Sequence, residues 1–401
     1  MVDNLWDMQL TLLMMYWDEL NSNKIIVQYS RNRKKFYKTL SKVNRRIRDR
    51  RIPRMSLQDP HESSWRRLYM SNNESAMITL TGLDMATFQW LNSLFHPMFQ
   101  MYSPFVGEDG KIRIKQIGKG RPRFIDSKDC LGLILAWSRL RGSTISLQMI
   151  FGMTATNVSV YLRFGRRLVI RILHKHPEAK LGIPSDEKIK QYQEAIGSRH
   201  KNLKNVWCTM DGLKLLLEQA PDCVIQNNFY NGWTHDHYVT SVFVFCPDGT
   251  IPIATYNVPG CIHDSMIADW GEIYEKMSTV YERTGGQVTV DSAFCRANNE
   301  FLIKSSQANL DDDDPNAFVV NIEATAMRQS AEWGMRALKA SFPRLKDRFI
   351  YEEYGERRLY FKFLLLIYNV RARRVGINQI QNTYMPHLEK DVNKEFGIPL
   401  Y

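Results

Sequence analysis

The sequence predicts an α/β protein, in which a mixed sheet flanked by helices follows an all-α region with a helix-turn-helix. From about residue 205 onward, short apolar runs rich in β-branched residues alternate with segments of helical period. Before residue 176, apolar residues recur at helical spacing and tight turns separate them. The 401 residues are enough for more than one domain, and a composition with 44% hydrophobic residues excludes bulk disorder.

The positive charge is concentrated in two segments. The net charge is +12; residues 31–54 carry +11 and residues 111–176 carry +12, whereas the remainder of the chain is acidic. Two separate runs of this density favour nucleic acid as the partner. A membrane is disfavoured, because no apolar run reaches the ~18–20 residues of a spanning helix. The first residues lack the basic region of a signal peptide, so we expect the cytosol or the nucleus.

These patterns divide the chain into four parts. A helical region over residues 76–176 contains a candidate N-cap, Thr81, before a helix from Gly82 to Phe95, and three further helices between Asp129 and His174. The other parts are a basic arm and linker over residues 1–75, the α/β domain over residues 200–380 and a C-terminal tail over residues 381–401.

A helix-turn-helix pattern lies in residues 145–173. Gly152 marks the turn, and apolar side chains on either side of it fall where two helices would pack on each other. The outward face of the second helix can then enter a major groove, with arginines at the phosphates. An ordinary helical hairpin in a core is the alternative. The base-reading candidates are Thr154, Thr156, Ser159 and Arg163, and the phosphate candidates are Arg166, Arg167 and Arg171.

A second candidate for DNA contact is the loop Gly118–Arg123, which reads Gly-Lys-Gly-Arg-Pro-Arg. An extended Gly-Arg-Pro segment fits the narrow A·T minor groove, whose negative potential attracts arginine. Arg121 and Arg123 are therefore candidates for insertion into the minor groove. A basic loop that only connects two elements is the alternative.

The elements of the second half follow in a recognisable order. We expect three strands at Val206–Asp211, Tyr238–Cys246 and Ile251–Val258, a helix at Asp264–Arg283, a strand at Gln287–Asp291, a helix at Asn298–Ser306, a strand at Ala317–Ile322 and a helix at Thr325–Phe342. This order is the one expected of an RNase H-like sheet.

Three acidic residues fall at informative positions in this order. Asp211 lies on the first strand, Asp291 ends the strand after the crossover helix, and Glu332 lies inside the last helix. Three carboxylates can hold two Mg²⁺ or Mn²⁺ ions, which prefer hard oxygen ligands. Two such ions can activate the attacking oxygen and stabilise the leaving oxygen in phosphodiester cleavage.

The last helix also carries cations on the face of Glu332. Arg328, Arg336 and Lys339 are spaced so that they share this face, where they can hold DNA phosphates. A surface helix with ion pairs between neighbouring turns is the alternative. Glu323 is a rival third carboxylate, expected at a strand end.

Other metal-binding patterns are weak. His235 and His237 flank Asp236, but no cysteine pair lies at zinc spacing, so a polar strand start is the preferred interpretation. The six cysteines show no Cys-x-x-Cys pair and lie in apolar surroundings, which favours reduced thiols. They are Cys130, Cys208, Cys223, Cys246, Cys261 and Cys295.

Four ordered blocks resemble the Harbinger-type (PIF/Harbinger) transposases with a DDE superfamily endonuclease domain. They are TMDGLK around Asp211, NVPGCIHDS around Asp264, TVDSAF around Asp291 and RQSAEWGMRALKASFPRLKDRF around Glu332. The later block LIYNVRARRVGINQI is also similar, and the resemblance spans about residues 129–380. The last block keeps the Arg-x3-Glu-x6-Lys arrangement of related insertion-sequence transposases, but Thr325 stands where these have tyrosine.

The resemblance implies a metal-dependent DNA endonuclease and strand-transferase. Asp211, Asp291 and Glu332 become the catalytic, metal-binding triad, whereas His263 and Asp264 support the ligands or cap a helix, with direct ligation as the alternative. Water would cut the transposon end, and the freed 3′-hydroxyl would attack target DNA. The resemblance also implies a nuclear protein, a separate Myb-like DNA-binding partner, and a homodimer or higher oligomer.

Two alternatives to a transposase stay open at this point. One is a domesticated, transposase-derived nuclear DNA-binding or regulatory protein without transposition activity. The other is a general RNase H-like nuclease, for which activity independent of DNA sequence or on RNA–DNA hybrids would be expected.

Overall fold

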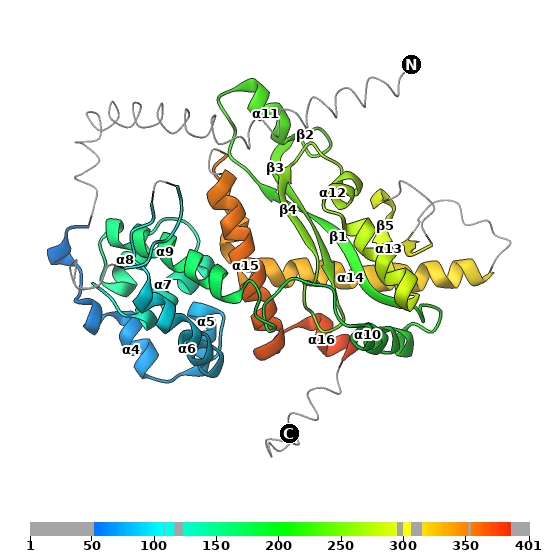
Figure 1. Cartoon of the computed structure of the whole chain (residues 1–401). Coiled ribbons are helices and arrows are strands. Elements are labelled where there is room, and N and C mark those ends of the chain that lie inside the picture. The colour runs from blue at the N-terminus through cyan, green and yellow to red at the C-terminus, as the bar shows by residue number, and fades with distance from the viewer. Residues whose placement is uncertain are drawn as a thin grey trace, which may run out of the picture. The chain divides into compact units, whose positions relative to one another are not determined.

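The computed structural model describes residues 52–385, except residues 108, 116–122, 295–299, 306–314 and 352–353. The chain divides into two units, Met1–Ser56 and Leu57–Tyr401. The first unit contributes only the 3-10 helix η1 (Arg54–Ser56) to the described elements, so the predicted basic arm, except residues 52–54, lies outside the described residues. The second unit contains both the helical region and the sheet (Figure 1).

The helical region starts with η2 (Pro60–Glu62), α4 (Ser64–Met70), α5 (Glu74–Thr81) and α6 (Met85–Met101). Helix α5 ends at Gly82, whose φ of 82° is left-handed, and the carboxylate of Asp84 caps α6 by accepting from the Thr87 N–H at 2.7 Å. The predicted N-cap at Thr81 is therefore wrong. Thr81 is the last residue of α5, and its hydroxyl donates back to the Met77 carbonyl at 2.7 Å.

The three helices predicted between Asp129 and His174 are confirmed. They are α7 (Ser127–Arg139), α8 (Ile145–Phe151) and α9 (Ala155–Leu173). Gly152 ends α8 with a left-handed φ of 63°, and α8 and α9 are bent by 90° relative to each other. No single helix in the described part of the chain is long and apolar enough to cross a membrane, although this bent pair passes the same test of length and composition when taken together.

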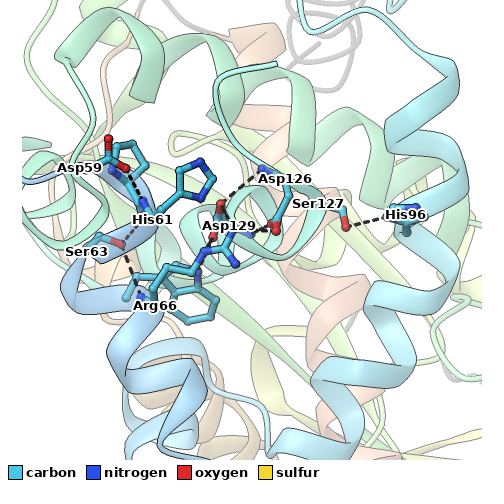
Figure 2. A network of polar contacts seen from close by, with 10 residues as sticks. Asp59, His61, Ser63, Arg66, His96, Asp126, Ser127 and Asp129 are labelled. Carbon is cyan, nitrogen blue, oxygen red and sulfur yellow. Dashed lines mark hydrogen bonds and ion pairs between the residues drawn. The ribbon is translucent and has the colours of Figure 1, made fainter. Parts of the chain in front are cut away.

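A buried polar network joins α4 to the start of α7 (Figure 2). Arg66 Nη2 donates to Asp126 at 2.6 Å and to Asp129 at 2.7 Å, while Trp65 Nε1 donates to Asp129 at 3.1 Å. Asp126 and Asp129 also form a capping box at the start of α7. Because Asp129 is only 2% exposed, these partners offset the cost of burying its carboxylate.

The sheet contains parallel and antiparallel pairs, as predicted. Its strands are β1 (Val206–Leu216), β2 (Tyr230–Asn231), β3 (Asp236–Phe245), β4 (Ala254–Pro259), β5 (Gln287–Asp291) and β6 (Leu302–Ser305). The order is β2-β3-β1-β5-β6, with β4 also paired to β3. Strand β3 is antiparallel to β1, β2 and β4, whereas β5 is parallel to β1 and β6.

Helices cover both faces of this sheet (Figure 1). On one face, Leu213 and Leu215 of β1 pack in a core cluster with Met327 of α14 (Pro315–Ser341). On the other face, Met210 of β1 packs in a second cluster with side chains of α10 (Asp186–Arg199), α12 (Asp264–Trp270) and α13 (Ile273–Thr284). The remaining elements are α11 (Cys223–Phe229), η3 (Ser292–Phe294), η4 (Pro343–Lys346), α15 (Tyr354–Arg374) and α16 (Gln379–Tyr384).

Three element predictions in the second half are wrong. The run Ala317–Ile322 is not a strand but part of the helix α14, because a short apolar run alone does not distinguish a strand from a helix. The segment Leu302–Ser305, expected in a helix, is strand β6. The helix expected at Asp264–Arg283 is two helices, separated at Glu272, which has a left-handed φ of 55°.

Candidate active site

The pairing of β1 with β5 places Asp211 and Asp291 on neighbouring strands. The two strands are parallel, with Thr209 opposite Thr289, and each aspartate lies two residues further along its strand. Side chains alternate along a strand, so Asp211 shares the face of Leu213, which packs in the cluster with α14. The same count places Asp291 on this face.

Helix α14 adds a cation and a third carboxylate beside these aspartates. Arg328 Nη1 lies 3.7 Å from Asp291 Oδ2, and Arg328 Nη2 lies 3.9 Å from Glu332 Oε1, one turn along the helix. The Glu332 side chain is 50% exposed, so it borders solvent. One guanidinium therefore contacts two of the three predicted carboxylates and comes from the face that Asp211 shares.

Negative charge accumulates around Asp211. Burial, together with the charges of Asp291 and Asp264, raises the pKa of Asp211 to about 6, although the Gly212 N–H and Arg328 act to lower it. The Gly212 N–H donates to Asp211 Oδ1 at 2.7 Å. A carboxylate in such surroundings is stabilised by any additional cation that approaches it.

Asp264 lies against β1 at Gly212. Its carboxyl group occupies the space that a Cβ atom on Gly212 would take. Burial raises the pKa of Asp264, which Lys214 and His263 lower, and its Oδ1 is buried without a hydrogen-bond partner among the described residues. His263 stands at the N-cap position of α12 but makes no side-chain capping hydrogen bond. The helix-cap interpretation of His263 therefore does not hold.

Residues 210–369 match the family model of the DDE superfamily endonuclease. This endonuclease domain runs from the centre of β1 into α15 and includes Asp211, Asp264, Asp291 and Glu332. The match supports a nuclease with a DNA substrate. No curated protein and no solved structure matches the chain.

Nucleases of the DDE superfamily generally use divalent metals, and the donor chemistry of this endonuclease domain fits such ions. Asp211, Asp291 and Glu332 offer hard oxygens, and the buried Oδ1 of Asp264 lacks a partner among the described residues. The expected convergence of the triad is nevertheless not observed. In the described part of the chain, no group of three or more His, Cys, Asp or Glu side chains gathers closely enough to hold a metal ion. Arg328 contacts Asp291 and Glu332 instead.

Among the rival metal ligands, Glu323, His235 and Asp236 have other partners in the endonuclease domain and next to it. Glu323 lies on α14 rather than at a strand end, and it accepts hydrogen bonds from the backbone and side chain of Asn202 at 2.8 and 3.1 Å. His235 contacts the Tyr230 hydroxyl at 3.2 Å, while Asp236 accepts from Arg348 at 2.7 and 3.0 Å. These contacts agree with a polar strand start.

Two predicted phosphate contacts on α9 are engaged inside the protein. Arg166 is 8% exposed and pairs with Glu356 of α15 at 3.2 Å, so the prediction of a phosphate contact for Arg166 is wrong. Arg167 pairs with the same carboxylate and donates to the Gly110 carbonyl at 2.8 Å. Arg171 is exposed, with its guanidinium 5.1 Å from the centre of the Tyr102 ring.

The other predicted DNA contacts are distributed as follows. Thr156, Ser159 and Arg163 are exposed on α9, whereas Thr154 is half-buried at its N-cap position. On α14, Arg336 is exposed and Lys339 is half-buried. Arg123 donates to the carbonyls of Gln100 and Tyr102 at 3.2 and 2.6 Å and lies over Phe99, so it braces the end of α6. Arg121 lies outside the described residues.

Two further residues were not predicted: Gly212, which borders the site, and Glu356, which pairs with two arginines of α9. Gly212 lies inside β1, and a glycine inside a strand signals a close approach of another group. Glu356 carried no signal, because its pairing with Arg166 and Arg167 joins residues far apart in the chain.

Proposed function

We propose that this protein is a metal-dependent DNA endonuclease and strand-transferase, a DNA transposase of the Harbinger type. The observation that carries the proposal is the match to a DDE superfamily endonuclease, within which the paired strands β1 and β5 carry Asp211 and Asp291, and Arg328 of α14 contacts Asp291 and Glu332. An RNase H-like fold is supported by the order β4-β3-β1-β5-β6, in which the first two pairings are antiparallel and the last two are parallel.

Asp211, Asp291 and Glu332 would hold two Mg²⁺ or Mn²⁺ ions. When bound, these ions supply positive charge to the attacking and leaving oxygens of a phosphodiester. Asp211 has to release its proton to act as a ligand, so protonation of this carboxyl group, whose pKa burial raises, competes with metal binding. Arg336 and Lys339, on the Glu332 face of α14, would hold the phosphates of the DNA.

In this proposal, the cut is made at a transposon end, and the freed 3′-hydroxyl then attacks target DNA. His263 and Asp264 border the site and support the ligands. The family resemblance extends the proposal to a nuclear location, a Myb-like DNA-binding partner protein and a homodimer or higher oligomer.

One structural observation favours the alternative, a domesticated DNA-binding or regulatory protein. The carboxylates of the triad do not gather around a shared point among the described residues, and Arg328 contacts two of them. A protein that retained the fold and lost transposition could keep this arrangement.

The test is cleavage of DNA that carries the transposon ends, with Mg²⁺ or Mn²⁺, by the full chain and by Asp291→Ala. Glu275→Ala, at an exposed position on α13, is the matched control. We expect cutting by the wild type and the control and none by Asp291→Ala. Equal cutting by all three would refute the active-site assignment. Salt-sensitive DNA binding by a wild type that does not cut would support the domesticated protein.

A further inference from the structure

The residues after α6 fold back on themselves as a short hairpin. The Ser103 N–H donates to the Arg113 carbonyl at 2.8 Å, the Lys115 N–H donates to the Met101 carbonyl at 2.8 Å, and Tyr102 forms an antiparallel bridge with Ile114. We use the name wing hairpin for residues 101–107 together with 109–115; residue 108 lies outside the described residues.

Contacts at two points fasten the wing hairpin along α9. The guanidinium of Arg171 lies 5.1 Å from the centre of the Tyr102 ring, and Arg167 Nε donates to the Gly110 carbonyl at 2.8 Å. Arg167 is itself paired with Glu356 of α15, which fixes its position. The hairpin is therefore held by the protein rather than only by its own hydrogen bonds.

A groove of about 340 Å³ separates the hairpin from the first half of α9. It is lined by Pro104, Phe105 and Val106 on one side and by Thr156, Ser159, Val160 and Arg163 on the other. These α9 residues include three of the predicted base-reading residues. The outward face of α9 is thus not an isolated helix surface, and a duplex that reached it would also meet the wing hairpin.

Both sides of this surface carry exposed cations. Lys111, Arg113 and Lys115 stand at alternate positions of the second arm of the hairpin and are all exposed. Helix α9 has no acidic residue and exposes Arg163 and Arg171. The carboxylate of Asp109 lies 3.9 Å from Arg113, an exposed pair that contributes little. The surface suits an extended polyanion better than a single anion.

We propose that the wing hairpin is a second DNA-binding element, which contacts the phosphates of duplex DNA through Lys111, Arg113 and Lys115 beside the outward face of α9. The inference rests on the proposed function, because the duplex is the substrate of the endonuclease. In this proposal, the three cations of the wing hairpin supply the phosphate contacts that were predicted for Arg166, because Arg166 is buried.

The test measures binding of the full chain to a labelled duplex of random sequence over a series of salt concentrations. The variant carries Lys111→Gln, Arg113→Gln and Lys115→Gln. The matched control carries Lys180→Gln, Lys190→Gln and Lys201→Gln, at three exposed positions outside the surface. A charge-retaining variant carries Lys111→Arg, Arg113→Lys and Lys115→Arg.

Each lost phosphate contact lowers the slope of log K against log salt by about 1. We expect the neutral variant to lose about 3 from this slope and to bind at least about tenfold more weakly at low salt. The control and the charge-retaining variant should keep the wild-type slope. Equal slopes for the neutral variant and the wild type would refute the proposal that the wing hairpin binds DNA. A slope in the charge-retaining variant that falls as far as that of the neutral variant would also refute it.

Binding and cleavage separate the two proposals. If the neutral variant lowers the salt slope but the wild type does not cut DNA, the wing hairpin binds DNA and the endonuclease proposal is refuted. If the wild type cuts DNA but the neutral variant keeps the wild-type slope, the endonuclease proposal stands and the wing proposal is refuted. A wild type that binds no duplex refutes the wing directly.

Discussion

The carboxyl group of Asp264 rests on the backbone of Gly212. All three of its terminal atoms lie within 2.8 Å of the position that a Cβ atom on Gly212 would occupy, which is closer than a side chain permits. The residue after Asp211 therefore has to be glycine for α12 to reach β1 in this position. The contact also places a second buried carboxyl group beside Asp211, whose pKa it helps to raise.

We predict that Gly212→Ala destabilises the protein by about 1–3 kcal/mol, since the added methyl group overpacks the contact. Urea unfolding measures the effect. Gly182→Ala is the control, because a Cβ there has no atom within 4 Å. In an Asp264→Ala background the cost of Gly212→Ala should shrink, because the clashing group is gone. An equal cost in both backgrounds would show that the strain arises elsewhere.

The titration of Asp211 predicts a gain in stability when its charge is removed. Its folded pKa of about 6 lies above the ordinary value, so the folded state holds the proton more tightly, and stability is lost as pH rises through about 6. We predict that Asp211→Asn, without divalent metal, is more stable than the wild type at pH 7.5, by up to about 3 kcal/mol. Below about pH 4 the two should match.

Unfolding midpoints over this pH range, in the presence of a chelator, measure the difference. Glu275→Gln, at an exposed position on α13, should follow the wild type throughout. A constant difference between Asp211→Asn and the wild type at all pH values would contradict the assigned titration.

The two strands that carry the first two carboxylates could be predicted from local sequence. Val206–Asp211 and Gln287–Asp291 are apolar, β-branched runs, and each reaches an acid, so their type and their chemistry are both visible in the sequence. The run Ala317–Ile322 has the same composition but belongs to α14. In this segment, tertiary packing determines whether the chain forms a helix or a strand. Local composition alone does not show the outcome.

The contacts between distant residues could not be predicted. Helical spacing placed Arg328 one turn from Glu332, but it could not show that Arg328 also lies within 4 Å of Asp291. The sequence pattern of α9 likewise identified the arginines. It did not identify Glu356, which comes almost 200 residues later and forms ion pairs with Arg166 and Arg167. Such pairs depend on topology and leave no trace in spacing.

The pairing of Glu356 with two arginines predicts a loss of stability in Glu356→Gln. Burial would raise the pKa of Glu356, but Arg167 and Arg166 outweigh it and lower the pKa, so the carboxylate stabilises the fold above its ordinary pKa. We expect Glu356→Gln to cost about 1–3 kcal/mol at pH 7, because the charged hydrogen bonds of Glu356 with Arg166 and Arg167 are weakened. The cost should fall as the pH falls through the pKa of Glu356.

Thermal unfolding at pH 7 and at acidic pH measures both parts of this prediction. Glu194→Gln, at an exposed position on α10, should be neutral within error. A Glu356→Gln variant as stable as the wild type at pH 7 would mean that the pairing of α9 with α15 contributes nothing.

The position of Arg328 predicts how Asp211 responds to its loss. Arg328 lowers the pKa of Asp211, which burial, Asp291 and Asp264 raise. Arg328→Gln should therefore move the pKa of Asp211 above about 6, and Arg328→Lys should keep most of the original value because the charge remains. In metal-free protein, the loss of stability should extend to higher pH in Arg328→Gln, because the pH at which it levels off follows the folded pKa of Asp211. The shift should vanish in Asp211→Asn, since that variant has no carboxyl group to titrate. A shift that persisted there would assign the titration to another carboxyl group, and Arg328 would then act on a different carboxylate from Asp211.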